Sequence, residues 1–173
     1  AAVAHTNRLP VLFLCGDTFV TRLPDPVLQQ VERFDDSTVS VNDAFKCVTR
    51  YWDRITHPAQ IIQSLPKSIA TMLDPADCGP AFIGLPQDIQ EIAYDYPAVF
   101  FDEKIHEIPR PRPDTRQVER AIEALKKAKR PMIIAGGGVR YAQAEAIVAK
   151  FSADFGIPIA ETMAGKGSLV HGH

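Results

Sequence analysis

The sequence predicts an α/β protein built from two partial parallel-sheet units that are joined by a proline-rich linker. Apolar runs of strand length alternate with segments in which apolar residues recur every three to four positions. This alternation is typical of parallel sheets whose faces are covered by crossover helices. Five of the 14 prolines fall within residues 86–113, which indicates a semi-rigid extended segment between two halves. A chain of 173 residues with 46% hydrophobic and 23% charged side chains can bury a core without disulfides.

The first half contains two runs that predict strands buried on both faces, residues 10–16 and 79–85. Residues 37–41 predict a weaker strand between them. Residues 17–36 are polar and interrupted by proline, so we expect a long loop there. The opening Ala1–Ala4 is typical of the end of a helix.

A helix is predicted between these strands. It begins near Pro58, because proline lacks an N–H and that donor has no partner at the first helical position. Apolar residues from Ile61 to Met72 keep the helical period. Pro66 lies inside this pattern and removes one backbone hydrogen bond, so we expect two short helices or a kink. Asp74 and Pro75 end the segment.

The second half repeats the pattern. Asp114 is a good N-cap for a helix ending near residues 129–130, and residues 131–135 form a short apolar strand. A second helix over 144–155 is closed by Gly156, and residues 157–160 form the next strand. Two strands do not make an independently stable sheet, so we expect this unit to be incomplete. The predicted division is 1–90, a linker over 91–113, and 114–173.

Charge and cysteine content exclude several classes of protein. A net charge of −2 gives no electrostatic footprint for nucleic acid or anionic membranes. The three cysteines are an odd number without close spacing, which indicates free thiols rather than a disulfide framework or a zinc site. No apolar run approaches the roughly 18 residues of a membrane span. We therefore expect a cytoplasmic protein with no nucleic-acid or membrane partner.

The motifs allow two interpretations of one glycine turn. Gly136, Gly137 and Gly138 follow a predicted strand and precede a helix, where backbone amides can meet an anionic ligand; a simple tight turn is the alternative. The dinucleotide fingerprint fails because Tyr141 stands at the third glycine position. The segment from Gly165 to Ser168 lacks the spacing of a phosphate-binding loop. The histidines have no metal-ligand spacing, and no catalytic constellation is visible.

Several motifs in order resemble the thiamine-diphosphate-dependent enzymes of the acetolactate synthase and pyruvate oxidase type. The matching segments of the second half are 128–139, 155–158 and 162–167, and those of the first half are 10–16, 47–50, 79–80 and 85–90. The resemblance implies that residues 1–90 are the end of a pyrimidine-binding domain and residues 114–173 the start of a Rossmann-like central domain.

Within that family, four segments look most like the ring-opening hydrolases of inositol catabolism: 16–18, 24–30, 41–45 and 50–55. This resemblance implies a small cyclic diketone as substrate, trihydroxycyclohexane-1,2-dione, which is opened to 5-deoxyglucuronate. It also implies thiamine diphosphate and Mg²⁺ as cofactors and a homodimeric or tetrameric intact enzyme. The thiamine ylid supplies the carbanion sink that splitting a C–C bond of an α-diketone needs.

The resemblance places few functional residues within the chain. The family's cofactor-activating Glu and its diphosphate motif are expected outside the 173 residues, so we expect no catalytic or metal-binding residue here and an inactive fragment. Gln30 aligns with a Gln near the cofactor of the paired subunit. The turn at Gly136, Gly137 and Gly138 inherits a nucleotide role, because some relatives hold FAD or ADP there.

Three alternatives stay open at this point. One is an acetolactate-synthase-like enzyme acting on a C–C bond, and another is a non-catalytic α/β module that binds FAD or ADP. The third is a piece whose main activity is subunit association.

Overall fold

A computed structural model describes residues 1–23 and 35–172. They form two compact units, Ala1–Pro109 and Arg110–His173, which are described separately. No helix among the described residues is both long and apolar enough to cross a bilayer.

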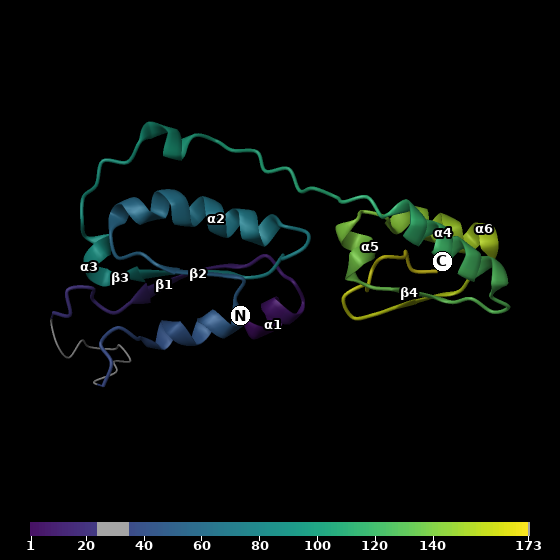
Figure 1. Cartoon of the computed structure of the whole chain (residues 1–173), viewed down its shortest axis with the longest axis horizontal. Helices are drawn as coiled ribbons and strands as arrows, with labels where there is room; N and C mark the ends of the chain where they lie inside the picture. The colour runs from purple at the N-terminus through teal and green to yellow at the C-terminus, as the bar shows by residue number, and fades with distance from the viewer. Residues whose placement is uncertain (24–34, 173) are drawn as a thin grey trace. The chain divides into compact units, whose positions relative to one another are not determined.

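The first unit is built on a three-stranded parallel sheet (Figure 1). Its strands are β1 (Leu12–Asp17), β2 (Tyr51–Arg54) and β3 (Ala81–Pro86), in the order β1-β3-β2. The central strand carries the buried core: Ala81, Phe82 and Ile83 are 0% exposed. The predicted strands at 10–16 and 79–85 are confirmed.

The predicted strand at residues 37–41 is wrong. Ser40 is instead the N-cap of a 3-10 helix, η1 (Val41–Val48), and forms a capping box with Asp43. The spacing Ser-x-x-Asp encodes this cap, and it outweighs the β-propensity of the short run before it. The strand that the prediction missed is β2, whose residues all lie half-buried at the sheet edge.

Helix α2 (Ile61–Leu73) follows a short 3-10 turn, η2 (Pro58–Gln60), and packs on β2 and β3. Pro58 occupies the first turn as predicted. Of the two expected effects of Pro66, the division into two helices is wrong, because α2 continues through this residue; the kink stays a prediction. Ser64 and Ser68 are buried on the face toward the sheet, and this packing offsets the lost backbone hydrogen bond.

Three stacked rings fill the other face of the sheet. Phe82 lies between Phe45 of η1 and Trp52 of β2, with ring centroids 4.7 and 6.2 Å away. Figure 1 shows α2 on one face of the sheet and α1 (Ala2–Thr6) and η1 on the other. Helical elements therefore lie on both faces of this sheet, as is typical of parallel sheets.

Few regular elements follow β3 in this unit. They are α3 (Gln87–Gln90) and η3 (Ala98–Phe101). Aromatic rings from Tyr94 to Phe101 contact one another in series, beginning with an edge contact of Tyr94 on His57 at 5.7 Å. Residues 102–114 contain no helix or strand.

The second unit contains a two-stranded parallel sheet with three helices. Its elements are α4 (Thr115–Lys127), β4 (Ile133–Ala135), α5 (Gly137–Tyr141), α6 (Glu145–Phe155) and β5 (Ile159–Glu161). Asp114 caps α4 through the amides of Arg116 and Gln117, as predicted. Gly156 closes α6 with a φ of 61°, a left-handed conformation that favours glycine.

Candidate functional site

The carboxyl ends of β4 and β5 are bridged by the turn that follows β5. Thr162 donates its backbone N–H to the Ala135 carbonyl at 2.9 Å, which continues the sheet by one bond. Gly165 donates to the Thr162 carbonyl at 3.1 Å, and the buried Ser168 hydroxyl donates to the Gly165 carbonyl at 2.6 Å. These bonds fold residues 162–168 back against the end of β4.

Gly165 is the position where this turn requires glycine. A Cβ there would overlap the Ala135 carbonyl oxygen and would lie 2.7 Å from the Ala135 carbonyl carbon and 3.0 Å from Gly136 Cα, all of them backbone atoms that cannot rotate away. Gly167 also has a left-handed φ of 84°. Close backbone approach at Gly165 and the left-handed φ at Gly167 therefore explain the two glycines of this Gly-Lys-Gly segment.

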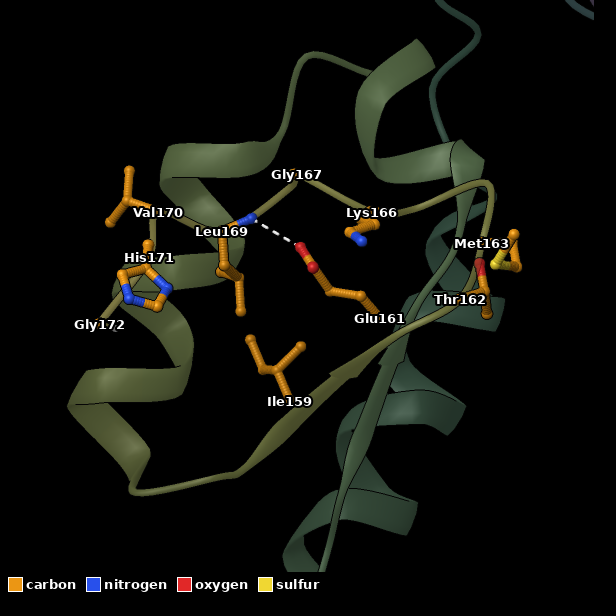
Figure 2. A pocket seen from close by; sticks show the side chains of 10 residues that line it. All are labelled: Ile159, Glu161, Thr162, Met163, Lys166, Gly167, Leu169, Val170, His171 and Gly172. Carbon is orange, nitrogen blue, oxygen red and sulfur yellow. Dashed lines mark hydrogen bonds between the residues drawn. The ribbon is translucent and has the colours of Figure 1, made fainter.

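A pocket of about 680 Å³ opens beside the turn (Figure 2). Its polar lining comes from Glu161, Thr162, Lys166 and His171, and its apolar lining from Ile159, Met163, Leu169 and Val170. Figure 2 shows the Glu161 side chain reaching across the hollow toward the Leu169 amide. The volume falls within the range of small-molecule sites, which is about 300–1,000 Å³.

Backbone amides hold the Glu161 carboxylate in its charged form. The Leu169 N–H donates to Glu161 Oε1 at 2.9 Å. This bond, helped by the amides of Gly167 and Ser168 and by the charge of Lys166, lowers the pKa of Glu161. The pocket therefore contains a hydrogen-bonded carboxylate that interacts with the charge of Lys166, and the His171 imidazole is another part of its lining.

The predicted glycine turn is not among the residues that line this pocket. Gly136 caps α5 with a φ of −103°, and neither Gly137 nor Gly138 has a positive φ. A Cβ at Gly138 would have no heavy atom of the described residues within 4 Å, and one at Gly137 would make ordinary contacts of 3.4 and 3.5 Å. None of the three glycines is required by steric crowding, so their nucleotide role stays a prediction. Gln30, the other predicted cofactor contact, lies outside the described residues.

A second cluster of charged groups lies at the carboxyl edge of the first sheet. Arg54, the last residue of β2, donates from Nε to Asp17 Oδ2 and from Nη2 to Asp43 Oδ2, both at 2.6 Å. The same guanidinium donates to Ser40 Oγ at 2.8 Å and to the Thr38 carbonyl at 3.2 Å. One arginine thus connects β1, β2 and the start of η1.

Hydrogen bonds favour the charged forms of Arg54 and Asp43. Burial alone would lower the pKa of Arg54, but the bonds to Asp17 and Asp43 reverse this and raise it. Burial would likewise raise the pKa of Asp43, whereas bonds from Lys46, the Ser40 amide and Arg54 hold it well below its usual range. The space for the Asp17 carboxylate comes from Gly84 of β3, because a Cβ there would lie 2.8 Å from Asp17 Oδ2.

Sequence reasoning missed this cluster. The sequence signal was Asp17, directly after one predicted strand, and Arg54, at the end of a short segment that also contains Tyr51 and Trp52. The two side chains meet because both strands run parallel to β3.

Comparisons with known proteins give the family. A profile described as "Thiamine pyrophosphate enzyme, central domain" matches residues 118–173. A 3D-(3,5/4)-trihydroxycyclohexane-1,2-dione hydrolase from Clostridium tetani is 47% identical over 169 residues, covering 98% of this chain and 26% of that protein. The protein of the same description from Geobacillus thermodenitrificans is 44% identical over 173 residues, covering 100% and 27%. The chain thus spans about a quarter of the length of these curated relatives.

Solved structures share the fold at low sequence identity. A thiamin diphosphate-dependent enzyme from Mycobacterium smegmatis gives a TM-score of 0.72 at 20% identity, covering 99% of this chain and 31% of that chain. Benzoylformate decarboxylase from Polynucleobacter necessarius gives 0.73 at 19%, covering 99% and 30%. The ordered motifs, the α/β architecture and the sequence identity with the curated relatives agree. The chain belongs to the thiamine-diphosphate-dependent enzyme family.

Proposed function

We propose that this chain belongs to a thiamine-diphosphate-dependent hydrolase that opens the ring of 3D-(3,5/4)-trihydroxycyclohexane-1,2-dione. The observation that carries the proposal is 44–47% identity over 98–100% of the chain to proteins of that description. The product would be 5-deoxyglucuronate, in the degradation of inositol. A homodimeric or tetrameric assembly and a cytoplasmic location are part of the same proposal.

We assign no described residue of this chain to the cofactor's metal. Nowhere in residues 1–23 and 35–172 do three or more His, Cys, Asp or Glu side chains gather as a metal site. When bound, thiamine diphosphate supplies the carbanion sink for cleaving the C–C bond. We assign no step of that reaction to this chain. We propose that this chain contributes two packed units to the enzyme. The first carries the charged cluster around Arg54 at the carboxyl edge of its sheet, and the second carries the pocket that Glu161 lines.

The protein expressed from its complete gene tests the proposal. We expect it to consume the cyclic dione with a rate that depends on added thiamine diphosphate and Mg²⁺. Formation of acetolactate from pyruvate, with no turnover of the dione, would instead establish the alternative of an acetolactate-synthase-like enzyme. Light scattering tests the assembly, for which a monomer is the contrary result.

The pocket supports a second candidate function, a module that binds FAD or ADP. Glu161 ends the second strand of a βαβ arrangement whose first strand ends at a glycine turn, and in dinucleotide-binding folds an acidic residue in this place binds the ribose. The candidate ranks second because it depends on the pocket alone.

Calorimetric titration with ADP and FAD separates the two candidates. Micromolar binding that is weakened at least tenfold by Lys166→Met supports a nucleotide in the pocket. Arg116→Met is the matched control, since Arg116 is an exposed cation of the same unit away from the pocket lining. No heat of binding with either nucleotide would eliminate this candidate.

A further inference from the structure

The cluster around Arg54 is a costly arrangement for stability alone. The Asp17 side chain is 1% exposed and that of Arg54 is 18% exposed. Desolvating two charges offsets most of their attraction, so apolar replacements of such pairs are often neutral or stabilising. The more informative property of the cluster is therefore the backbone geometry that its hydrogen bonds fix.

The geometry that it fixes is the polypeptide at one edge of the sheet. Arg54 binds the Thr38 carbonyl and the Ser40 hydroxyl, and the Asn42 side-chain amide donates to the Gly16 carbonyl at 2.7 Å. Residues 38–42 are thereby held against the carboxyl end of β1. Each of these three hydrogen bonds joins β1 or β2 to a residue between 38 and 42.

A second anchor acts on the residues that follow β1. Asp88, just after β3, accepts from the amides of Val20 at 3.1 Å and Thr21 at 2.9 Å, and from the Thr21 hydroxyl at 2.9 Å. Residues 20–21 are thus tied to the start of α3 after β3, whereas residues 38–42 are tied to the carboxyl ends of β1 and β2.

This edge is the one where open parallel sheets bind ligands. At Gly16, near the end of β1, no heavy atom of the described residues lies within 4 Å of the place a Cβ would take. The described residues therefore leave this side of Gly16 uncovered, while its carbonyl accepts from Asn42. The Arg54 guanidinium itself is engaged by four acceptors.

We infer that Arg54 is a positioning residue, which holds residues 38–42 beside the carboxyl end of β1 and so shapes the substrate-facing edge of the first unit. The inference rests on the proposed function for the nature of the substrate, a polyhydroxylated cyclic dione. Arg54 acts through the backbone that it fixes and does not touch the substrate.

The test uses the protein expressed from its complete gene, with the double variant Asp17→Asn/Arg54→Met. This variant removes both buried charges, while the Asn oxygen still accepts from Thr18 and Ser40. We expect an unfolding midpoint close to that of the unchanged protein. Hydrogen exchange of residues 38–42 should become at least tenfold faster, and KM for the dione should rise at least fivefold with kcat within twofold.

Arg54→Lys keeps the positive charge but cannot reach four acceptors. Its hydrogen-exchange rate at residues 38–42 and its KM for the dione should therefore lie between those of the unchanged protein and those of the double variant. This variant decides the matter if the double variant does not fold. Arg50→Gln is the matched control: Arg50 precedes β2 at the opposite edge and pairs with the exposed Asp77 at 3.4 Å. It should leave KM and the exchange of residues 38–42 unchanged.

Unchanged KM and exchange in Arg54→Lys and the double variant would overturn the inference, whatever happens to the midpoint. Faster exchange with unchanged KM would also overturn it, because the cluster would then be structural only. Absence of dione turnover in the unchanged protein is a failure of the proposed function instead. The exchange rates still decide in that case whether Arg54 fixes residues 38–42.

Discussion

Replacing Gly165 by alanine should disrupt the turn that joins the two strands of the second unit. The new methyl carbon would lie 2.7 Å from the Ala135 carbonyl carbon, where ordinary contact begins at 3.4 Å. The Ala135 carbonyl oxygen would lie closer still, so the turn or the end of β4 must move by more than the 0.7 Å that separates 2.7 Å from 3.4 Å. Neither neighbour is the flexible end of a side chain, so the backbone itself must shift.

The shift has a cost that can be estimated from the bonds it strains. Overpacking of this kind costs about 1–3 kcal/mol. The bond from Thr162 N to the Ala135 carbonyl, 2.9 Å long, contributes a further net ~1 kcal/mol if it is lost. We expect Gly165→Ala to lower the free energy of unfolding by about 3 kcal/mol.

Gly138→Ala is the matched control. It adds the same methyl group at a helical position of α5, where no described atom lies within 4 Å of the new carbon. Alanine is favoured over glycine in helices by up to about 1 kcal/mol, so this variant should be neutral or stabilising. Urea denaturation of both variants, with hydrogen exchange at the Thr162 amide, measures the difference. Equal stabilities within about 0.5 kcal/mol would refute the assignment of Gly165 as the crowded glycine.

Three further changes test other parts of the structure. Gly84→Ala should weaken the Asp17 ion pair and destabilise the first unit by about 2 kcal/mol in thermal unfolding, because its Cβ would lie 2.8 Å from Asp17 Oδ2; an unchanged midpoint would contradict this. Burial alone would raise the pKa of Asp88, but bonds from loop amides and a hydroxyl lower it, so Asp88→Asn should destabilise at neutral pH. That difference is complete above the ordinary value of 3.8 and should vanish as pH falls through the lower folded pKa; a difference independent of pH would refute it. Ser152→Ala removes a buried 2.6 Å bond to the Ile157 carbonyl and should cost about 1–2 kcal/mol in denaturant unfolding, whereas no loss would show that this carbonyl finds another partner.

Local patterns predicted most of the elements because each depends on neighbouring residues. The buried strands, the Asp114 cap and the Gly156 stop follow from apolar runs, a short acceptor side chain and a left-handed φ. The error at residues 37–41 was also local, since the cap at Ser40 was present in the sequence but was not recognised. The motifs likewise carried the family, because their order along the chain is itself sequence information.

Only the tertiary structure decided which polar and glycine residues matter at the two sheet edges. Gly136 to Gly138 and Gly165 look alike in sequence, but the strand end at Ala135 crowds Gly165 alone among them. Asp17 and Arg54 are 37 residues apart and meet because β1 and β2 run parallel on either side of β3. The sequence by itself determined most of the elements and the family. Pairing across the sheet decided the sites, because their contacts join residues that no local pattern links.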